Sequence, residues 1–248
     1  MMRFSLLCIL FLLLIGCKKS EDRTCIKSTG DETVVTIDAP QGLDSLYLFD
    51  DIFYELIEDE HSRIEIHAGE NLQNHIDFAL ENGKITLNNH NRCDWVRGFD
   101  SEINVKIYAP EFRYIHYEGY NKVISSSTLT SQNLFVYMHW NAGEINMDVD
   151  VGYLEVIAMS GWGNFNLSGN TGVSFLVCKE NSFCDATDLN TKASLKIVSE
   201  SSANMRVNAD HVSKLEAETK ARGNIYYTGQ PEEVVFLQSG EGEIIHND

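Results

Sequence analysis

Asp148 and Asp150 are the best candidates in the sequence for acid–base or cation-binding chemistry. They stand two residues apart in an alternating stretch, so both side chains are expected on one outward face of a strand. Polysaccharide-cleaving enzymes and calcium sites both need clustered carboxylates, and the enzymes also need a cation nearby. The nearest matching cation in the repeats described below is Arg206, three repeats along the chain, or about 14 Å at 4.8 Å per repeat. This separation is too large for one active site, so we expect a solvated acidic face.

His116 and His139 are histidines of neighbouring repeats. Their places in the repeat differ by one residue, so strand alternation predicts opposite faces and no shared metal ion. The sequence contains no Gly-x-Ser-x-Gly, HExxH or P-loop motif. It therefore predicts no catalytic residue, no metal site and no cofactor.

Four aromatic residues fall at or near the same turn of successive repeats: Tyr120, Trp140, Trp162 and Phe183. The repeat alignment predicts that Trp162 and Phe183 are adjacent rungs of one ladder at a corner. Exposed aromatic rings offer rigid, amphipathic area to sugar rings and to protein partners. We treat the four residues as a candidate ligand platform. The alternative is a stacked ladder that only stabilises the corners.

The chain has six cysteines, of which Cys8 lies in an apolar leader. The pairings predicted for the four cysteines beyond Cys17 are Cys25 with Cys93 and Cys178 with Cys184, because an even number in an exported chain favours disulfides. The first pair would close a long loop and stabilise the fold by roughly 4 kcal/mol. For the second pair, two free thiols in the interior are an equally good interpretation.

The elements that must position these residues are set by a repeat of about twenty residues that begins near Phe112. Each unit opens with an apolar strand and continues through a turn to a small-polar-apolar tripeptide. Apolar residues alternate within the unit, which indicates strands. Two short strands and two turns in each unit predict one coil of a parallel β-helix or β-roll. The tripeptides are Gly143-Glu144-Ile145, Gly163-Asn164-Phe165, Cys184-Asp185-Ala186, Ala203-Asn204-Met205, Gly223-Asn224-Ile225 and Gly242-Glu243-Ile244.

The part of the chain before Phe112 is less regular, and we expect an irregular β cap that is continuous with the coils. Leu56–Ile66 is helical or extended at its start, and Asn71–Leu80 is weakly amphipathic. The predicted domain covers residues 33–248, with an N-terminal part at 33–111 and regular repeats at 112–248. Strands are expected at Val34–Ile37, Ser45–Phe49, Arg63–His67, Lys84–Asn88 and Ile103–Tyr108.

Residues 1–16 have the pattern of an export signal, with a charged start and an apolar run too short to span a membrane. The run ends at Leu14-Ile15-Gly16-Cys17, which resembles the bacterial lipobox. We expect Cys17 to carry the lipid and residues 17–32 to form a lipidated tether that binds the membrane. The formal charge of −18 argues against nucleic acid as a partner.

The closing stretch Arg222-Gly223-Asn224-Ile225-Tyr226-Tyr227-Thr228-Gly229-Gln230-Pro231 resembles the signature of the putative auto-transporter adhesin head GIN domain family. The resemblance extends over residues 33–246. It implies an all-β fold, a right-handed parallel β-helix, in an outer membrane lipoprotein of the Bacteroidota, displayed on the cell surface or on the periplasmic face. It implies no enzyme activity and favours an adhesin or binding module for a carbohydrate or protein ligand. The alternatives are a polysaccharide-active enzyme on a β-helix scaffold and a structural envelope spacer.

Overall fold

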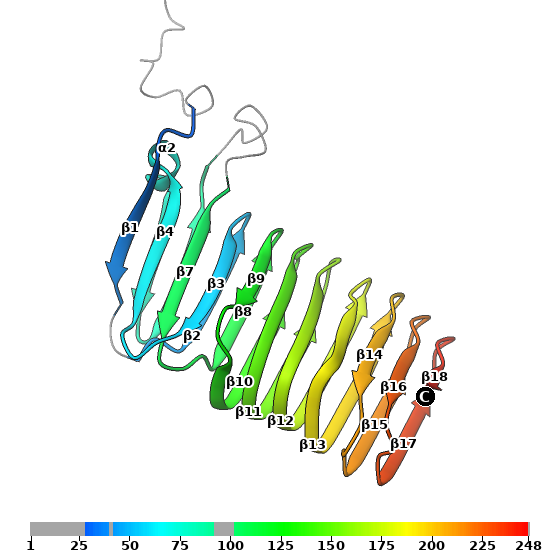
Figure 1. The fold of residues 1–248 in the computed structure, drawn as a ribbon. Coiled ribbons are helices and arrows are strands. Elements are labelled where there is room, and N and C mark those ends of the chain that lie inside the picture. The colour runs from blue at the N-terminus through cyan, green and yellow to red at the C-terminus, as the bar shows by residue number, and fades with distance from the viewer. Residues whose placement is uncertain (1–27, 40–41, 92–101, 248) are drawn as a thin grey trace, which may run out of the picture.

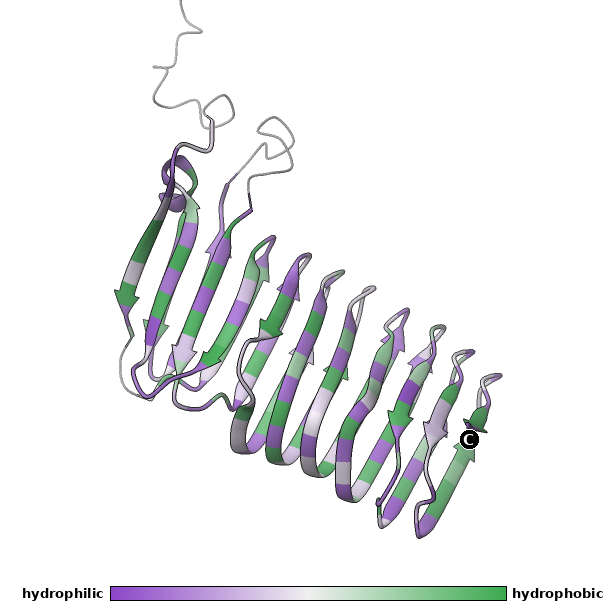
Figure 2. Cartoon of the chain, viewed as in Figure 1, coloured by the Kyte–Doolittle hydropathy of each residue, from purple (hydrophilic) through white to green (hydrophobic). Residues whose placement is uncertain are grey.

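The computed structural model describes residues 28–39, 42–91 and 102–247, and it confirms the predicted all-β fold. Parallel coils stack into a β-solenoid, and the ends of the described chain lie at opposite ends of the stack (Figure 1). Apolar and polar residues alternate along the strands, as the banding in Figure 2 shows. Alternation turns one set of side chains into the interior, where they form the core, and the other set toward solvent. No helix in the described residues is long and apolar enough to cross a membrane.

Each coil contributes one strand to each of two faces of the solenoid, which we call face 1 and face 2. Face 1 contains β5 (Ile76–Glu81), β6 (Lys84–Asn89), β2 (Ser45–Asp50), β8 (Tyr114–Gly119), β10 (Leu129–Met138), β15 (Lys214–Thr219) and β17 (Glu233–Gln238). Face 2 contains β1 (Glu32–Asp38), β4 (Arg63–Gly69), β7 (Asn104–Ala109), β3 (Phe53–Glu58), β9 (Lys122–Ser125), β14 (Met205–Asn208), β16 (Ile225–Thr228) and β18 (Ile244–His246). Three long strands begin on face 2 and bend onto face 1: β11 (Glu144–Ala158), β12 (Asn164–Glu180) and β13 (Cys184–Ser201).

Like positions of successive coils stack into ladders, and one inward ladder on face 2 forms the centre of the core. Its residues occupy the third place of the predicted tripeptides except in one coil. There Cys184 pairs with Phe165 and Met205, so it takes the third place and not the first. The ladder runs through Val123, Ile145, Phe165, Cys184, Met205, Ile225 and Ile244.

The N-terminal part is built into the solenoid rather than placed on its end. β2 and β3 form a coil that lies between the β6–β7 coil and the β8–β9 coil, all in parallel register. Spatial order therefore differs from sequence order. Only β4, β1 and the β5 hairpin arm complete the end of the stack, and the short helix α2 (Glu70–Gln73) packs on β4 and β1.

The five strands predicted in this region are confirmed, but β3 and β5 were not predicted as strands. At β3 the sequence left helix and strand open. Tyr54 and Leu56 are buried and alternate with partly exposed neighbours, which is the period of a strand. The helical stretch after Gly69 is limited to four residues, because β5 starts at Ile76 as one arm of an antiparallel hairpin with β6.

Of the two interpretations of Cys178 and Cys184, the structure has the two free, fully buried thiols and not the disulfide. Cys178 points inward where β12 ends on face 1, and Cys184 points inward where β13 begins on face 2. Burial raises the pKa of the Cys184 thiol well above its usual value, and a hydrogen bond with the Cys178 thiol adds to this. The two side chains therefore meet inside the core. Cys17, Cys25 and Cys93 lie outside the described residues.

We expect both thiols to resist alkylation at pH 8 in the folded protein and to react fully after unfolding without reductant, because burial shields both sulfur atoms and raises the pKa of the Cys184 thiol. Lys179 lies between them, so trypsin separates Cys178 and Cys184 into different peptides whose alkylation is read by mass spectrometry. A pair of linked peptides that stays unalkylated after unfolding would establish the disulfide instead.

Candidate binding surface

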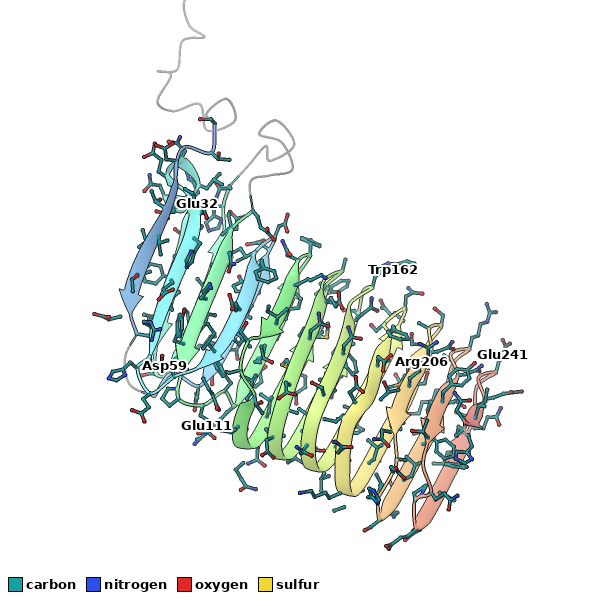
Figure 3. All side chains as sticks on the ribbon, viewed as in Figure 1. Glu32, Asp59, Glu111, Trp162, Arg206 and Glu241 are labelled. Atoms are coloured by element: carbon teal, nitrogen blue, oxygen red, sulfur yellow. The ribbon has the colours of Figure 1, made fainter. Side chains whose placement is uncertain are left out.

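The corner that joins face 1 to face 2 carries three exposed aromatic side chains on successive coils. We call Tyr120, Trp140 and Trp162 the aromatic corner. Their exposed fractions are 66%, 69% and 68%. The bridge between Asn141 and Gly161 sets the register, so Trp162 stands beside Ala142 of the preceding coil. Figure 3 shows Trp162 at the corner tips, away from the interior of the stack.

Hydrogen bonds from backbone N–H groups to neighbouring coils hold the corner in place. The Trp162 N–H donates to the Asn141 carbonyl at 2.9 Å, and the Trp140 N–H donates to Ser160 Oγ at 3.0 Å. The Gly161 N–H donates to Glu180 Oε2 of the next coil at 2.8 Å. The turn backbone is therefore tied to the coils on both sides while the indole rings stay in solvent.

A glycine is required at the turn that presents Trp162. Gly161 has φ of +105°, and a Cβ there would lie 2.1 Å from the Asn141 carbonyl oxygen. Trp140 also has positive φ, +48°, which is uncommon for a large residue. An unfavourable backbone conformation of this kind persists only where the surrounding contacts hold it in place. It marks this corner as a candidate site.

Phe183 does not belong to the aromatic corner. The predicted Trp162–Phe183 ladder is wrong, because it depended on placing Cys184 first in its tripeptide. In the observed register Phe183 stands one residue before the inward ladder and is paired with Asn164, whose Oδ1 accepts from the Phe183 N–H at 3.0 Å. The ring lies on the outward side of face 2, half-buried, with the Arg206 guanidinium 5.7 Å from its centroid.

The two histidines share a face, contrary to the prediction. His116 pairs with Tyr137, so His139 aligns with Glu118 and points outward like His116. Glu118 lies 2.8 Å from His116 Nε2 and 3.7 Å from His139 Nδ1. In the described residues no group of three or more His, Cys, Asp or Glu side chains is arranged to hold a metal ion.

Face 2 also carries an open polar groove of about 450 Å³ over β11, β12 and β13. Three aspartates belong to its lining, Asp148, Asp185 and Asp188, together with amide and hydroxyl side chains. Ser168 Oγ donates to Asp148 at 2.9 Å, and Thr187 Oγ1 donates to Asp185 at 2.7 Å. The Asn166 amide nitrogen donates to Asn146 Oδ1 at 2.6 Å, so hydrogen bonds also connect the amide side chains of the lining.

A β-bulge shapes the groove. The register between β12 and β13 slips by one residue between Asn166 and Ser168, which makes Thr187 the extra residue of β13. Bulges re-aim side chains and are common beside binding sites. The groove could not be predicted from the repeat, because the bulge redistributes residues within a coil while the period stays near twenty. Asp150 and Arg206 do not line it.

Outward tyrosines on face 1 share one carboxylate. Tyr137 and Tyr153 donate to the two oxygens of Glu155, at 2.5 and 2.8 Å. The hydrogen bond to Glu155 raises the pKa of Tyr137 to about 12, and desolvation, followed by the same carboxylate, raises that of Tyr153 to about 12. Both phenols therefore stay neutral at physiological pH and serve as hydrogen-bond donors, Tyr137 between coils and Tyr153 within β11.

Comparison with known proteins adds the family and the fold. The family model described as "Putative auto-transporter adhesin, head GIN domain" matches residues 42–231. No curated protein is significantly similar in sequence to the chain. A "putative adhesin" from Bacteroides fragilis NCTC 9343 has a similar solved structure, with TM-score 0.79 and 19% identity over 90% of this chain and 100% of the other.

Two further solved structures are similar. A "putative lipid binding protein" from Parabacteroides distasonis ATCC 8503 has TM-score 0.62 and 16% identity, over 90% of this chain and 99% of that chain. A "putative adhesin" from Parabacteroides merdae ATCC 43184 has TM-score 0.55 and 18% identity over the same shares of the two chains. At these identities the similarity establishes a common fold.

Proposed function

Since the chain belongs to the "Putative auto-transporter adhesin, head GIN domain" family, we propose that it is a lipid-anchored adhesin of the cell envelope that binds a carbohydrate at the aromatic corner. The observation that carries the proposal is the exposure of Tyr120, Trp140 and Trp162, each about two-thirds open to solvent on successive coils. Exposed aromatic rings leave apolar area in contact with water, which is unfavourable. Three of them on neighbouring coils therefore indicate a surface that a ligand covers.

The polar groove supports a carbohydrate in particular. Sugar rings combine an apolar face with hydroxyl groups, which suits an aromatic surface beside amide, hydroxyl and carboxylate groups. The groove and the corner share strand β12: Trp162 precedes it, and Asn166 and Ser168 line the groove. Four residues of extended chain separate Trp162 from Asn166, or about 13 Å. One oligosaccharide can contact both.

A structural spacer is less well supported, because it requires neither a groove nor exposed aromatic residues. A polysaccharide-active enzyme is the second candidate, because Asp148, Asp185 and Asp188 all line the groove. The lining contains no lysine, arginine or histidine, and two of these aspartates already accept hydrogen bonds from neighbours. An enzyme would shorten a bound oligosaccharide, whereas an adhesin releases it intact, and chromatography of the recovered ligand separates the two.

The anchor completes the proposal. Residues 1–16 are the export signal, Cys17 carries the lipid, and residues 17–32 are the tether, in an outer membrane lipoprotein displayed on the cell surface or on the periplasmic face. The family of adhesins supports a place at the cell surface or envelope. Co-flotation of the protein with lipid vesicles, lost on Cys17→Ala substitution, is the expected result.

A glycan-array screen of the wild-type protein beside Trp162→Ala tests the site. We expect selective binding that weakens roughly 30-fold in the variant, or about 2 kcal/mol, because a central aromatic contact is lost. Phe78→Ala is the matched control, since this ring is 43% exposed on β5, far from the corner. Equal binding by Trp162→Ala and wild type would remove the corner as the site, and an array with no selective binding would refute the carbohydrate ligand.

A further inference from the structure

The C-terminal end of the described solenoid presents an open edge of two strands. β17 is hydrogen-bonded to β15 alone, and β18 to β16 alone, among the described strands. All six residues of β17 are exposed. The exposed fractions of Val234, Val235, Phe236 and Leu237 are 48%, 37%, 42% and 56%.

These apolar residues continue the core outward. Val234 and Phe236 align with the buried Leu215 and Ala217, so they occupy inward places that no further described coil covers. Val235 and Leu237 lie on the outward side of the same strand. β17 is thus apolar on both sides, and no described strand pairs with its outer backbone edge, an arrangement that edge strands of monomeric proteins usually avoid.

The two ends of the stack differ in shape. β17 and β18 belong to the same last coil, so the C-terminal edge is level on both faces. At the other end face 2 extends through β4 and β1 beyond β7, whereas face 1 extends only through β5 beyond β6. That edge is stepped, carries α2, and has acidic residues on and beside β1 at Asp31, Glu32 and Asp38. A second copy cannot continue both faces there at once.

We infer that the level edge binds a second copy of this chain, tail to tail, through β17 and β18. A two-fold axis perpendicular to the stack reverses strand direction, so β17 pairs antiparallel with β17 of the second copy while β18 pairs with β18. With the axis at Val235, Val234 of each copy lies opposite Phe236 of the other, and both face the joined core. The interface is isologous and closes at two copies.

The charges around the edge permit this contact. The four central residues of β17 are uncharged. Glu233 at its start lies 3.6 Å from Lys214, and Glu241 in the last corner lies 3.1 Å from Arg222, each within one copy. These ion pairs reduce the repulsion between the two acidic chains at the point where they meet.

Tail-to-tail pairing sets the geometry of adhesion, and this step depends on the proposed lipid anchor. The chain enters the solenoid at β1, at the end opposite to β17 and β18 (Figure 1). Face 2 has eleven strands, in the order β18, β16, β14, β13, β12, β11, β9, β3, β7, β4 and β1. Ten spacings of about 4.8 Å therefore separate β18 from β1 by about 48 Å. A pair therefore places the two β1 strands, where the proposed tethers begin, about 100 Å apart at opposite ends of the joined stack. It joins two facing membranes.

Analytical ultracentrifugation of the full chain in detergent tests the pairing. We expect twice the monomer mass for wild type and for Val34→Lys, which alters a 53%-exposed valine of the opposite edge strand β1. Val235→Lys places like charges opposite each other at the axis, and Leu237→Glu places a like charge opposite Glu233 of the second copy. Both variants, on the outward side of β17, are expected to give the monomer with an unchanged circular dichroism spectrum. A monomeric wild type at 100 μM, or a dimer broken by Val34→Lys and kept by both β17 variants, overturns the proposal.

Phosphatidylcholine vesicles that carry the full chain test the membrane bridging. Turbidity is expected to rise for wild type and Val34→Lys and to stay low for both β17 variants. A dimer in detergent without vesicle clustering would overturn the bridging. Flotation distinguishes the causes: a chain that does not float with vesicles refutes the lipid anchor, while the mass in detergent still decides the pairing.

Discussion

Replacing Phe165 by alanine is expected to lower the free energy of unfolding by about 3–5 kcal/mol. The side chain is fully buried in the inward ladder of face 2, between Ile145 and Cys184 of the neighbouring coils. Its removal leaves a cavity that these smaller neighbours cannot fill, because their backbones are fixed by the ladder hydrogen bonds. Urea unfolding followed by circular dichroism measures the loss.

Phe135→Ala is the matched control for this prediction. Phe135 is an outward residue of β10, half-buried, with its ring centroid 5.7 Å from that of Tyr153. Loss of one such aromatic contact is expected to cost about 1 kcal/mol. Equal losses for the two variants would show that the inward ladder does not dominate stability.

The position of the strands that Phe165→Ala destabilises provides a second readout. Coils of a solenoid contact only their neighbours, so stability is close to a sum of local terms. Hydrogen exchange should therefore accelerate most in β11, β12 and β13 of Phe165→Ala and least in β17. A uniform acceleration would indicate that the whole stack unfolds as one unit.

The coil repeat could be predicted from the sequence because every internal coil has the same two neighbours. Inward residues such as Ile145, Phe165 and Ile225 all meet an equivalent residue above and below, so the same apolar pattern recurs about every twenty residues. The error at Cys184 came from its small side chain, which resembled the glycine that opens other tripeptides. The corner that precedes Cys184 is one residue shorter than the corner that precedes Phe165. The bulges in β13 then add residues, so the coil period stays near twenty.

The order of the N-terminal coils could not be predicted, because it depends on contacts between residues far apart in sequence. Tyr54 pairs with Val105 on one side and Val123 on the other, and no periodic pattern in the chain signals this insertion. The same reason applies to the candidate site. Exposure of the aromatic corner follows from turn positions visible in the sequence, whereas the groove depends on a bulge at Thr187.

Gly161→Ala is expected to destabilise the fold by about 2–5 kcal/mol and to weaken ligand binding at the corner. A positive φ costs an alanine about 1–2 kcal/mol relative to glycine, and overpacking against backbone adds about 1–3 kcal/mol. The Asn141 carbonyl oxygen that the new Cβ would overlap accepts the Trp162 N–H, so relief of the overlap breaks this contact and moves the indole ring. Thermal unfolding and the glycan array measure the two effects.

Gly42→Ala separates the conformational cost from the steric one. Gly42 has φ of +86°, and a Cβ there would meet no atom within 4 Å, so only the conformational cost of about 1–2 kcal/mol applies. At about 2–4 °C per kcal/mol for a domain of this size, Gly42→Ala should lower Tm by roughly 2–8 °C and leave ligand binding intact. Gly161→Ala should exceed this loss and alone reduce binding, because only Gly161 is packed against the backbone that fixes Trp162. If the two variants lose equal stability and both retain full binding, the aromatic corner tolerates displacement and its geometry does not determine recognition.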